Sequence, residues 1–101
     1  MIFIGTEMFR TQAAARRRAS EVLHGHVMFV PLVEPDVDFV TALFWCHPRA
    51  LEKAGAGVDH FEVRPSPDGR TRNLWVSRID GSVDNFSIKE SVANHAAKET
   101  P

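Results

Sequence analysis

The sequence predicts a single α+β domain, in which two main helices and a short third pack on one face of a three- to four-stranded, mainly antiparallel sheet. Its length of 101 residues suits one domain, which we place at residues 1–101. Apolar residues recur at helical spacing in the first half and alternate with polar residues from Val58 onward. This change of period is typical of helices followed by strands.

The first quarter of the chain predicts a strand followed by a helix. Ile2–Ile4 is a short, β-prone apolar run that suits an edge strand. Thr11 can cap a helix over residues 12–24, and Gly25 stands where a left-handed residue often ends a helix. Three arginines at positions 16–18 spread over about 200° of that helix, so we interpret them as a solvated flank rather than a phosphate grip.

The middle of the chain predicts an extended connection and a second helix. Residues 25–36 contain two prolines and an apolar run, which is typical of an extended, partly buried segment. Asp36 or Asp38 can cap the helix, which should end near His47 because a residue before proline avoids helical geometry. Its apolar residues at helical spacing are Phe39, Val40, Leu43 and Phe44.

A short third helix and a flexible turn are expected to lead into the sheet. Pro48 suits the first turn of a helix over residues 48–54, because its missing N–H needs no partner there. Gly55 is expected to stop that helix. Gly55 and Gly57 then give the backbone freedom that a hinge-like turn needs.

The second half predicts a three-stranded meander. Strands are expected at residues 58–64, 72–79 and 83–88, and the Asp80-Gly81 pair predicts a hairpin between the last two. A two-residue loop would mix apolar and polar side chains on each face, so we prefer a three-residue connection with Gly81 left-handed. That register places on one face Leu74, Val76, Phe86 and Ile88.

Charge and cysteine content exclude several classes of protein. Twelve basic and thirteen acidic residues give a net charge of -1, so any electrostatic contact must be local. Cys46 is the single cysteine, which excludes an intramolecular disulfide. No apolar run approaches the roughly 20 residues of a spanning helix, and the start lacks the features of a signal peptide. We therefore expect a cytoplasmic protein without membrane contact, whose oligomeric state the sequence leaves open.

The signatures of catalysis and metal binding are missing from the sequence. It contains no glycine-rich phosphate loop and no Gly-x-Ser-x-Gly nucleophile elbow. His24 and His26 are close in sequence, but one cysteine and five histidines do not supply the clustered ligands of a structural zinc site. Adjacent Cys46 and His47 point about 100° apart on a helix and cannot form a thiol–imidazole pair. We therefore expect no enzyme activity, no catalytic residue, no metal and no cofactor.

Several short motifs follow one another from the second helix onward. They are His47-Pro48-x-x-x-x-Lys53-x-Gly55-x-Gly57, Phe61-x-Val63, Thr71-Arg72-x-x-Trp75-Val76-x-Arg78-x-Asp80-Gly81 and Asp84-x-Phe86-Ser87. Together they resemble the DCL domain, named for a plant protein whose loss gives defective chloroplasts and leaves. The resemblance is best over residues 39–92, and a short helix from Lys89 followed by a frayed tail at 93–101 is expected beyond the sheet.

The resemblance implies a role as well as a fold. Related domains are associated with plastid ribosomal RNA processing and occur at the end of the largest subunit of plant-specific RNA polymerases. The family pattern has cysteine where Asn73 and Ser91 stand, and a basic pair where Lys89 is followed by Glu90. No catalytic residue is carried over, and the motif residues interpreted as structural are His47, Pro48, Lys53, Gly55, Gly57, Asp80, Gly81 and Phe86. We interpret His47 as a cap of carbonyls at a helix junction and Lys53 as a side chain on a solvated turn.

One face of the predicted sheet has the composition of an RNA-binding surface. An aromatic ring such as Trp75 stacks a base for about 1 to 3 kcal/mol, and neighbouring arginines hold phosphate. The expected contact residues are Arg64, Arg72, Trp75, Arg78 and Lys89. The alternative is that the amino-terminal helix or strand covers Trp75 as a core residue.

The sequence thus favours a non-catalytic accessory module associated with nucleic acid, with RNA as the expected partner. The alternative function is protein interaction or assembly, in which the same tryptophan and arginines would form a hot spot for another protein.

Overall fold

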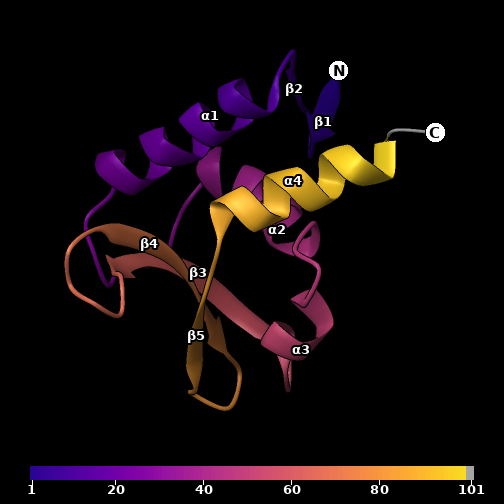
Figure 1. Cartoon of the computed structure of the whole chain (residues 1–101). Helices are drawn as coiled ribbons and strands as arrows, with labels where there is room; N and C mark the ends of the chain where they lie inside the picture. Colours follow the sequence, from indigo (N-terminus) through magenta and orange to yellow (C-terminus); the bar gives the residue numbers. More distant parts are fainter. Residues whose placement is uncertain (100–101) are drawn as a thin grey trace.

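The computed structural model describes residues 1–99, whose elements follow the predicted change from helices to strands (Figure 1). They are β1 (Ile2–Ile4), β2 (Glu7–Phe9), α1 (Gln12–Gly25), α2 (Asp36–Trp45), α3 (Ala50–Ala54), β3 (Val58–Pro65), β4 (Arg72–Arg78), β5 (Val83–Phe86) and α4 (Ile88–Glu99). Strands β3, β4 and β5 form an antiparallel sheet in that order, and β1 pairs with β2 in a separate antiparallel hairpin. The predicted α+β class is confirmed. Within the described part of the chain, no helix is long and apolar enough to cross a membrane.

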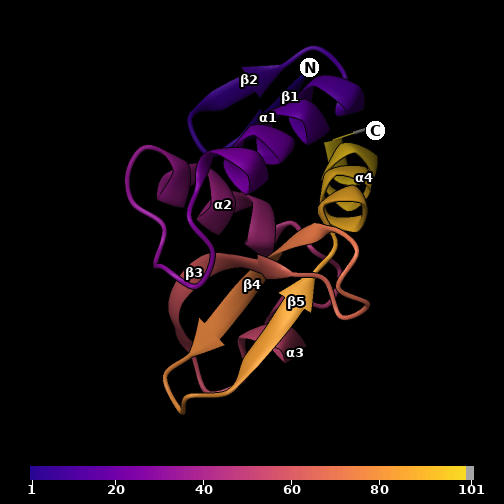
Figure 2. The same ribbon diagram turned by 90° about the vertical axis from the view of Figure 1, so that its left-hand side faces the viewer.

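The three longer helices form a layer over one face of the three-stranded sheet. Figure 2 shows α1, α2 and α4 on one side of the molecule and the sheet on the other. Phe44 of α2 packs against both Phe61 of β3 and Phe86 of β5, with 5.2 Å between the ring centroids in each pair. The core prediction is confirmed, because the buried side chains include Phe39, Leu43, Phe44, Phe61, Leu74, Val76 and Phe86.

The β4–β5 hairpin has the predicted register. Leu74 lies opposite Phe86, so both side chains face the helix layer, while Trp75 lies opposite Asn85 on the other face. The Arg78 N–H donates to the Ser82 carbonyl (2.8 Å), and Gly81 has a φ of 88°, as expected for a three-residue connection with a left-handed glycine. Strand β5 ends at Phe86, and Ile88, which was expected in the strand, begins α4.

The amino-terminal strand is present, but its partner was not predicted. Ile4 pairs with Glu7 across a tight turn in which Gly5 has a φ of 64°, so β2 returns beside β1 instead of leaving β1 at the edge of the main sheet. Both Ile2 and Ile4 are buried in the core. The hairpin therefore extends the helix layer rather than the sheet.

Helix α1 begins as predicted and ends differently. Thr11 Oγ1 accepts a hydrogen bond from the Ala14 N–H (3.1 Å), which confirms the cap. The prediction of a left-handed Gly25 was wrong, because Gly25 is the last helical residue and the extended His26, with a φ of -119°, follows it as the cap. The reason lies outside the helix: Arg72 Nη1 donates to the carbonyls of Leu23 and His26 (3.1 Å each). This arginine supplies hydrogen bonds that a left-handed glycine would otherwise help to provide.

An ion cluster joins the hairpin, α1 and α2. Asp36 was expected as a possible cap of α2, but it is the first helical residue, and it accepts hydrogen bonds from Arg18 (2.7 Å) and His26 (2.5 Å). Arg18 also pairs with Glu7 (2.7 Å), so this member of the arginine run is not a solvated flank. Partial burial acts to raise the pKa of Asp36, but the hydrogen bonds from His26 and Arg18 outweigh it and leave that pKa below its usual value.

The segment between α1 and α2 is more exposed than predicted. It runs along the edge of β3 opposite β4. There the backbone N–H of Phe29 donates to the Val63 carbonyl and that of Leu32 to the Phe61 carbonyl (2.9 Å each). Of its apolar run only Leu32 is buried, because this edge of the sheet has no further layer over it. The exposed members are Val27, Phe29, Val30 and Val33.

The last two helices also differ in length from the prediction. Helix α3 begins at Ala50, two positions after Pro48. Helix α4 continues to Glu99 through most of the expected frayed tail, of which residues 100–101 lie outside the described part. It is held in place because Val92 is fully buried and Asn94 Nδ2 donates to the Cys46 carbonyl (2.8 Å).

Candidate functional site

The five predicted contact residues lie in four separate places. Arg64 and Trp75 are neighbours on the face of the sheet that no helix covers, which we call the open face. Arg72 is bound beneath the end of α1, and Arg78 is bound to α3 on the covered face. Lys89 is exposed in the first turn of α4. The structure therefore brings together two of the five residues.

Trp75 is a half-buried residue of the open face. Its neighbours in β4, Leu74 and Val76, face the helix layer, so its indole faces away from that layer. The interpretation of Trp75 as a helix-covered core residue is therefore wrong. The indole Nε1 donates to the Pro65 carbonyl (3.2 Å), which fixes the ring near the end of β3.

Arg64 lies between two aromatic rings. Its guanidinium carbon is 5.9 Å from the centroid of the Trp75 ring and 5.2 Å from that of Phe29, both within the range of a cation–π contact. Its Nε donates to Glu62 Oε1 (2.6 Å), and its Nη2 contacts the same oxygen. Glu62 is nearly fully buried, so this carboxylate holds the arginine in one orientation and offsets its charge.

Phe29 is the residue of this group that sequence reasoning missed. Its side chain is 60% exposed, and its backbone has a φ of 66°, a left-handed conformation that costs an L-residue about 1 to 2 kcal/mol. The hydrogen bond to the Val63 carbonyl holds it there. The aromatic ring inside an apolar run was the available signal, but the run was interpreted as partly buried. We call Phe29, Arg64 and Trp75 the open-face stack.

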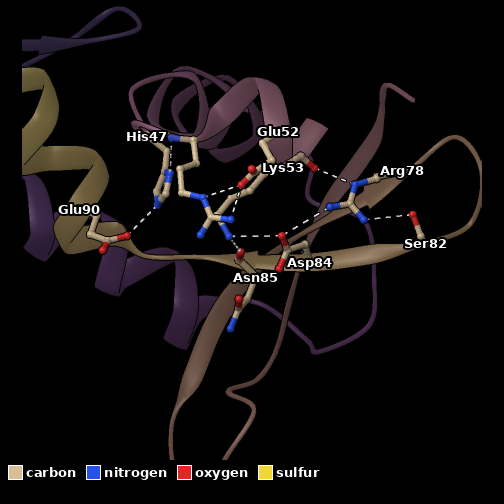
Figure 3. A network of polar contacts seen from close by, with 9 residues as sticks. His47, Glu52, Lys53, Arg78, Ser82, Asp84, Asn85 and Glu90 are labelled. Atoms are coloured by element: carbon tan, nitrogen blue, oxygen red, sulfur yellow. Dashed lines mark hydrogen bonds and ion pairs between the residues drawn. The ribbon is translucent and has the colours of Figure 1, made fainter. Parts of the chain in front are cut away.

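Several motif residues, among them His47, Lys53 and Arg78, lie in a network of polar contacts around α3 (Figure 3). His47 is buried, and its Nδ1 accepts from the Arg49 N–H (3.0 Å). The proton of a neutral ring therefore sits on Nε2, which donates to Glu90 Oε2 (2.9 Å). His47 thus caps an N–H at the start of α3 rather than carbonyls, which corrects our interpretation.

The interpretation of Lys53 as a side chain on a solvated turn is also wrong. This residue is buried, because its Nζ reaches β5 and donates to the Asn85 carbonyl (2.8 Å) and Asp84 (3.3 Å). Arg78 Nε donates to the Lys53 carbonyl (2.8 Å), and its Nη1 donates to Ser82 Oγ (3.1 Å). These contacts, drawn in Figure 3, fasten α3 to the β4–β5 hairpin.

The remaining motif residues also have structural surroundings. Gly55 has a φ of 54°, and a Cβ there would lie 2.9 Å from Arg78 Cδ. The left-handed Gly57 lies beside Ile79. Asp80 accepts from the N–H (3.0 Å) and hydroxyl (2.6 Å) of Ser82, and these two hydrogen bonds lower the pKa of Asp80. Phe86 is in the core, and Pro48 is exposed.

A groove lies between the end of α1 and the loop that joins β3 to β4. Its volume is about 520 Å³. Pro65 lines this groove and also accepts the hydrogen bond from Trp75. Within residues 1–99, no three His, Cys, Asp or Glu side chains lie close enough together to hold a metal ion.

Comparison with known proteins places the chain in a family. Residues 20–92 match the family described as "Protein of unknown function (DUF3223)". The chain is 34% identical over 71 residues to DNA-directed RNA polymerase IV subunit 1 of Arabidopsis thaliana, a match that covers 70% of this chain and 5% of that subunit. A solution NMR structure of an uncharacterized protein from Rhodospirillum rubrum is also similar, with a TM-score of 0.79, 32% identity, and coverage of 89% of this chain and 86% of that one. The chain therefore belongs to the DUF3223 family of proteins of unknown function.

Proposed function

We propose that this domain is a non-catalytic accessory module that binds single-stranded RNA on its open face. The observation that carries the proposal is the open-face stack, in which the rings of Phe29 and Trp75 flank Arg64. Exposed aromatic rings on a sheet stack unpaired bases, and an arginine plane adds a further stacking surface. The similarity to part of an RNA polymerase subunit supports an association with nucleic acid, and the resemblance to the DCL domain supports RNA.

Stacking should contribute more to this binding than charge. The charge of Arg64 is offset by Glu62, and Arg72 and Arg78 donate to protein acceptors away from the open face. A contact that releases few counterions depends weakly on salt. The proposal therefore predicts that the open-face stack itself adds little to the salt slope of RNA binding.

The test is a fluorescence titration of Trp75 with short single-stranded RNA at low and moderate salt, in a Trp45→Phe background that removes the other indole. RNA should quench the emission. Phe29→Ala should weaken binding by about 1 to 3 kcal/mol with little change in salt slope. Phe3→Ala is the matched control, because Phe3 is an exposed phenylalanine (54%) in strand β1, outside the open-face stack. Unchanged emission from a folded protein, or equal losses in both variants, would reject RNA binding at the stack.

The second candidate is a protein-interaction module that uses the same surface. The exposed apolar side chains of Val27, Val30 and Val33 beside Phe29 favour it, because a contiguous apolar patch often marks a protein interface. A partner protein retained at high salt and lost in Phe29→Ala would support this function. RNA quenching of Trp75 would favour the first.

A further inference from the structure

The groove between the end of α1 and the β3–β4 loop has the two parts of a site for an organic anion. Its lining includes three apolar residues, Leu23, Met28 and Pro65, which we call the apolar wall, and three polar ones, His24, Arg70 and Arg72. None of the described residues that line it carries a carboxylate. Ligand sites combine an apolar lining with a few convergent polar groups, and the volume of about 520 Å³ lies within their usual range.

Arg72 is held rigidly in this groove while keeping donors to spare. Only its Nη1 is used, in the two hydrogen bonds to the carbonyls at the end of α1. Its Nε and Nη2 have no acceptor among residues 1–99, which leaves three N–H groups of the guanidinium. A guanidinium fixed in this way is preorganised to donate hydrogen bonds to the oxygens of a phosphate group.

Arg70 adds a second charge at the exposed rim. Its side chain makes no ion pair within the described chain, and its backbone N–H donates to Asp68 Oδ1 (3.0 Å). Asp68, the nearest acid in sequence, is turned into its own loop, where it also accepts from the Ser66 hydroxyl (2.5 Å). The groove is therefore complementary to a negative charge.

We propose that this groove binds one nucleotide, with its base against the apolar wall and its phosphate at Arg70 and Arg72. Resting on the function proposed above, we assign that nucleotide to the RNA strand that stacks on Trp75. Pro65 connects the two sites, since it lines the groove and accepts the indole hydrogen bond. The footprint of the strand then runs from the open-face stack over Pro65 into the groove.

The test follows backbone amide and indole NMR signals of the full chain during titration with three probes: adenosine monophosphate, inorganic phosphate and a short oligo-adenylate RNA. The nucleotide should shift the amides of Gly69, Arg70 and Thr71 and bind roughly tenfold more tightly than inorganic phosphate, because it also uses the apolar wall. The oligonucleotide should bind more tightly still and should shift the Trp75 indole as well.

Arg70→Ala should weaken nucleotide binding by roughly tenfold and reduce the salt slope for the single-stranded oligonucleotide by about 0.7. The matched control is Arg10→Ala, an exposed arginine at the other end of α1, which should change neither. Equal losses in both variants would overturn the groove assignment, and so would the absence of nucleotide shifts at the β3–β4 loop.

The failures of the two proposals are distinguishable. If the oligonucleotide shifts the Trp75 indole but leaves the groove amides unchanged, the groove assignment is wrong and the open-face function stands. If the nucleotide shifts the groove amides but the oligonucleotide never shifts the indole, the open-face function is wrong. Equal affinity for the free nucleotide and the oligonucleotide would overturn the assignment to a strand.

Discussion

The two faces of the three-stranded sheet use arginine in opposite ways. On the covered face, Arg78 donates to the Lys53 carbonyl and the Ser82 hydroxyl, so its charge and donors serve the packing of α3. On the open face, Arg64 is bonded to the single carboxylate of Glu62, and the aromatic rings beside it reach solvent. The comparison teaches that a basic residue in a strand indicates a ligand only when the fold has not already used its donors.

The same comparison separates the motif residues from the candidate contacts only in part. Lys53, Arg78 and Phe86 belong to the sequence motifs, and their side chains hold the covered face to the helices. Trp75 belongs to the same motifs but lies on the open face. The other two members of the open-face stack, Phe29 and Arg64, lie outside the motifs.

The largest expected difference between the faces is in stability. Phe86→Ala removes a ring packed against Phe44 and Phe61, and should reduce the free energy of unfolding by about 3 to 5 kcal/mol. Trp75→Ala on the open face should reduce it by about 1 kcal/mol. Urea denaturation measures both, with Phe86→Leu as a variant that stays folded. Equal losses at the two positions would contradict the assignment of the faces.

The polar contacts of the covered face should matter next. Lys53→Ala leaves the Asn85 carbonyl without its charged donor and Asp84 without its nearer base, so it should destabilise by about 2 kcal/mol. Lys98→Ala, at an exposed lysine of α4, should stay within about 0.5 kcal/mol of the wild type. Thermal unfolding compares the two. A neutral Lys53→Ala would mean that α3 is held by apolar packing alone.

The hairpin that keeps Trp75 and Phe86 on opposite faces offers a sharper test. Gly81→Ala should destabilise by about 1 kcal/mol, because Gly81 has a φ of 88°. Gly25→Ala should instead stabilise slightly, since Gly25 is helical and a Cβ there meets nothing within 4 Å. The denaturation midpoint should fall in Gly81→Ala and rise in Gly25→Ala, relative to the wild type. Shifts of the same sign in both variants would contradict the assigned conformations.

The ion cluster of the helix layer should have the smallest effect. The pKa of Asp36 is lower in the folded state than its unfolded value of about 3.9, so the ionised carboxylate stabilises the fold above that pH and loses this effect as the pH falls through the folded pKa. Asp36→Asn should cost less than about 1 kcal/mol at neutral pH. Its deficit should shrink as the pH falls below about 3.9 and through the lower pKa of the folded state.

The control for that pH series is Glu21→Gln, at an exposed carboxylate of α1, which should keep the wild-type dependence on pH. A deficit of Asp36→Asn that is constant over the whole range would show that the Asp36 carboxylate is not the titrating group.

The sequence predicted the periodic parts of the molecule well. Helical spacing identified Phe39, Leu43 and Phe44 as core residues, and strand alternation together with Asp80-Gly81 identified the register of the hairpin. These features depend on neighbours within a few residues. They are therefore visible in the chain itself.

The candidate site was predicted only in part, because its chemistry depends on distant residues. Arg72 finds its acceptors in α1, 46 and 49 residues away along the chain, so its sequence position shows a charge but not how its donors are used. Lys53 is likewise paired with a carbonyl 32 residues away. The left-handed Phe29 depends on a hydrogen bond to Val63, which no local pattern indicates.

If Phe29 contacts RNA as proposed, binding and heat stability place opposite demands on this position. Its backbone conformation suits asparagine or glycine better than a bulky aromatic residue, so a screen for heat resistance alone would favour replacing it. A screen for retention on RNA would keep the ring. Variants selected for heat stability should therefore lose the aromatic ring at position 29, while variants selected for RNA binding should keep it. The two sets should differ at this position before they differ at any buried residue between the helices and the sheet.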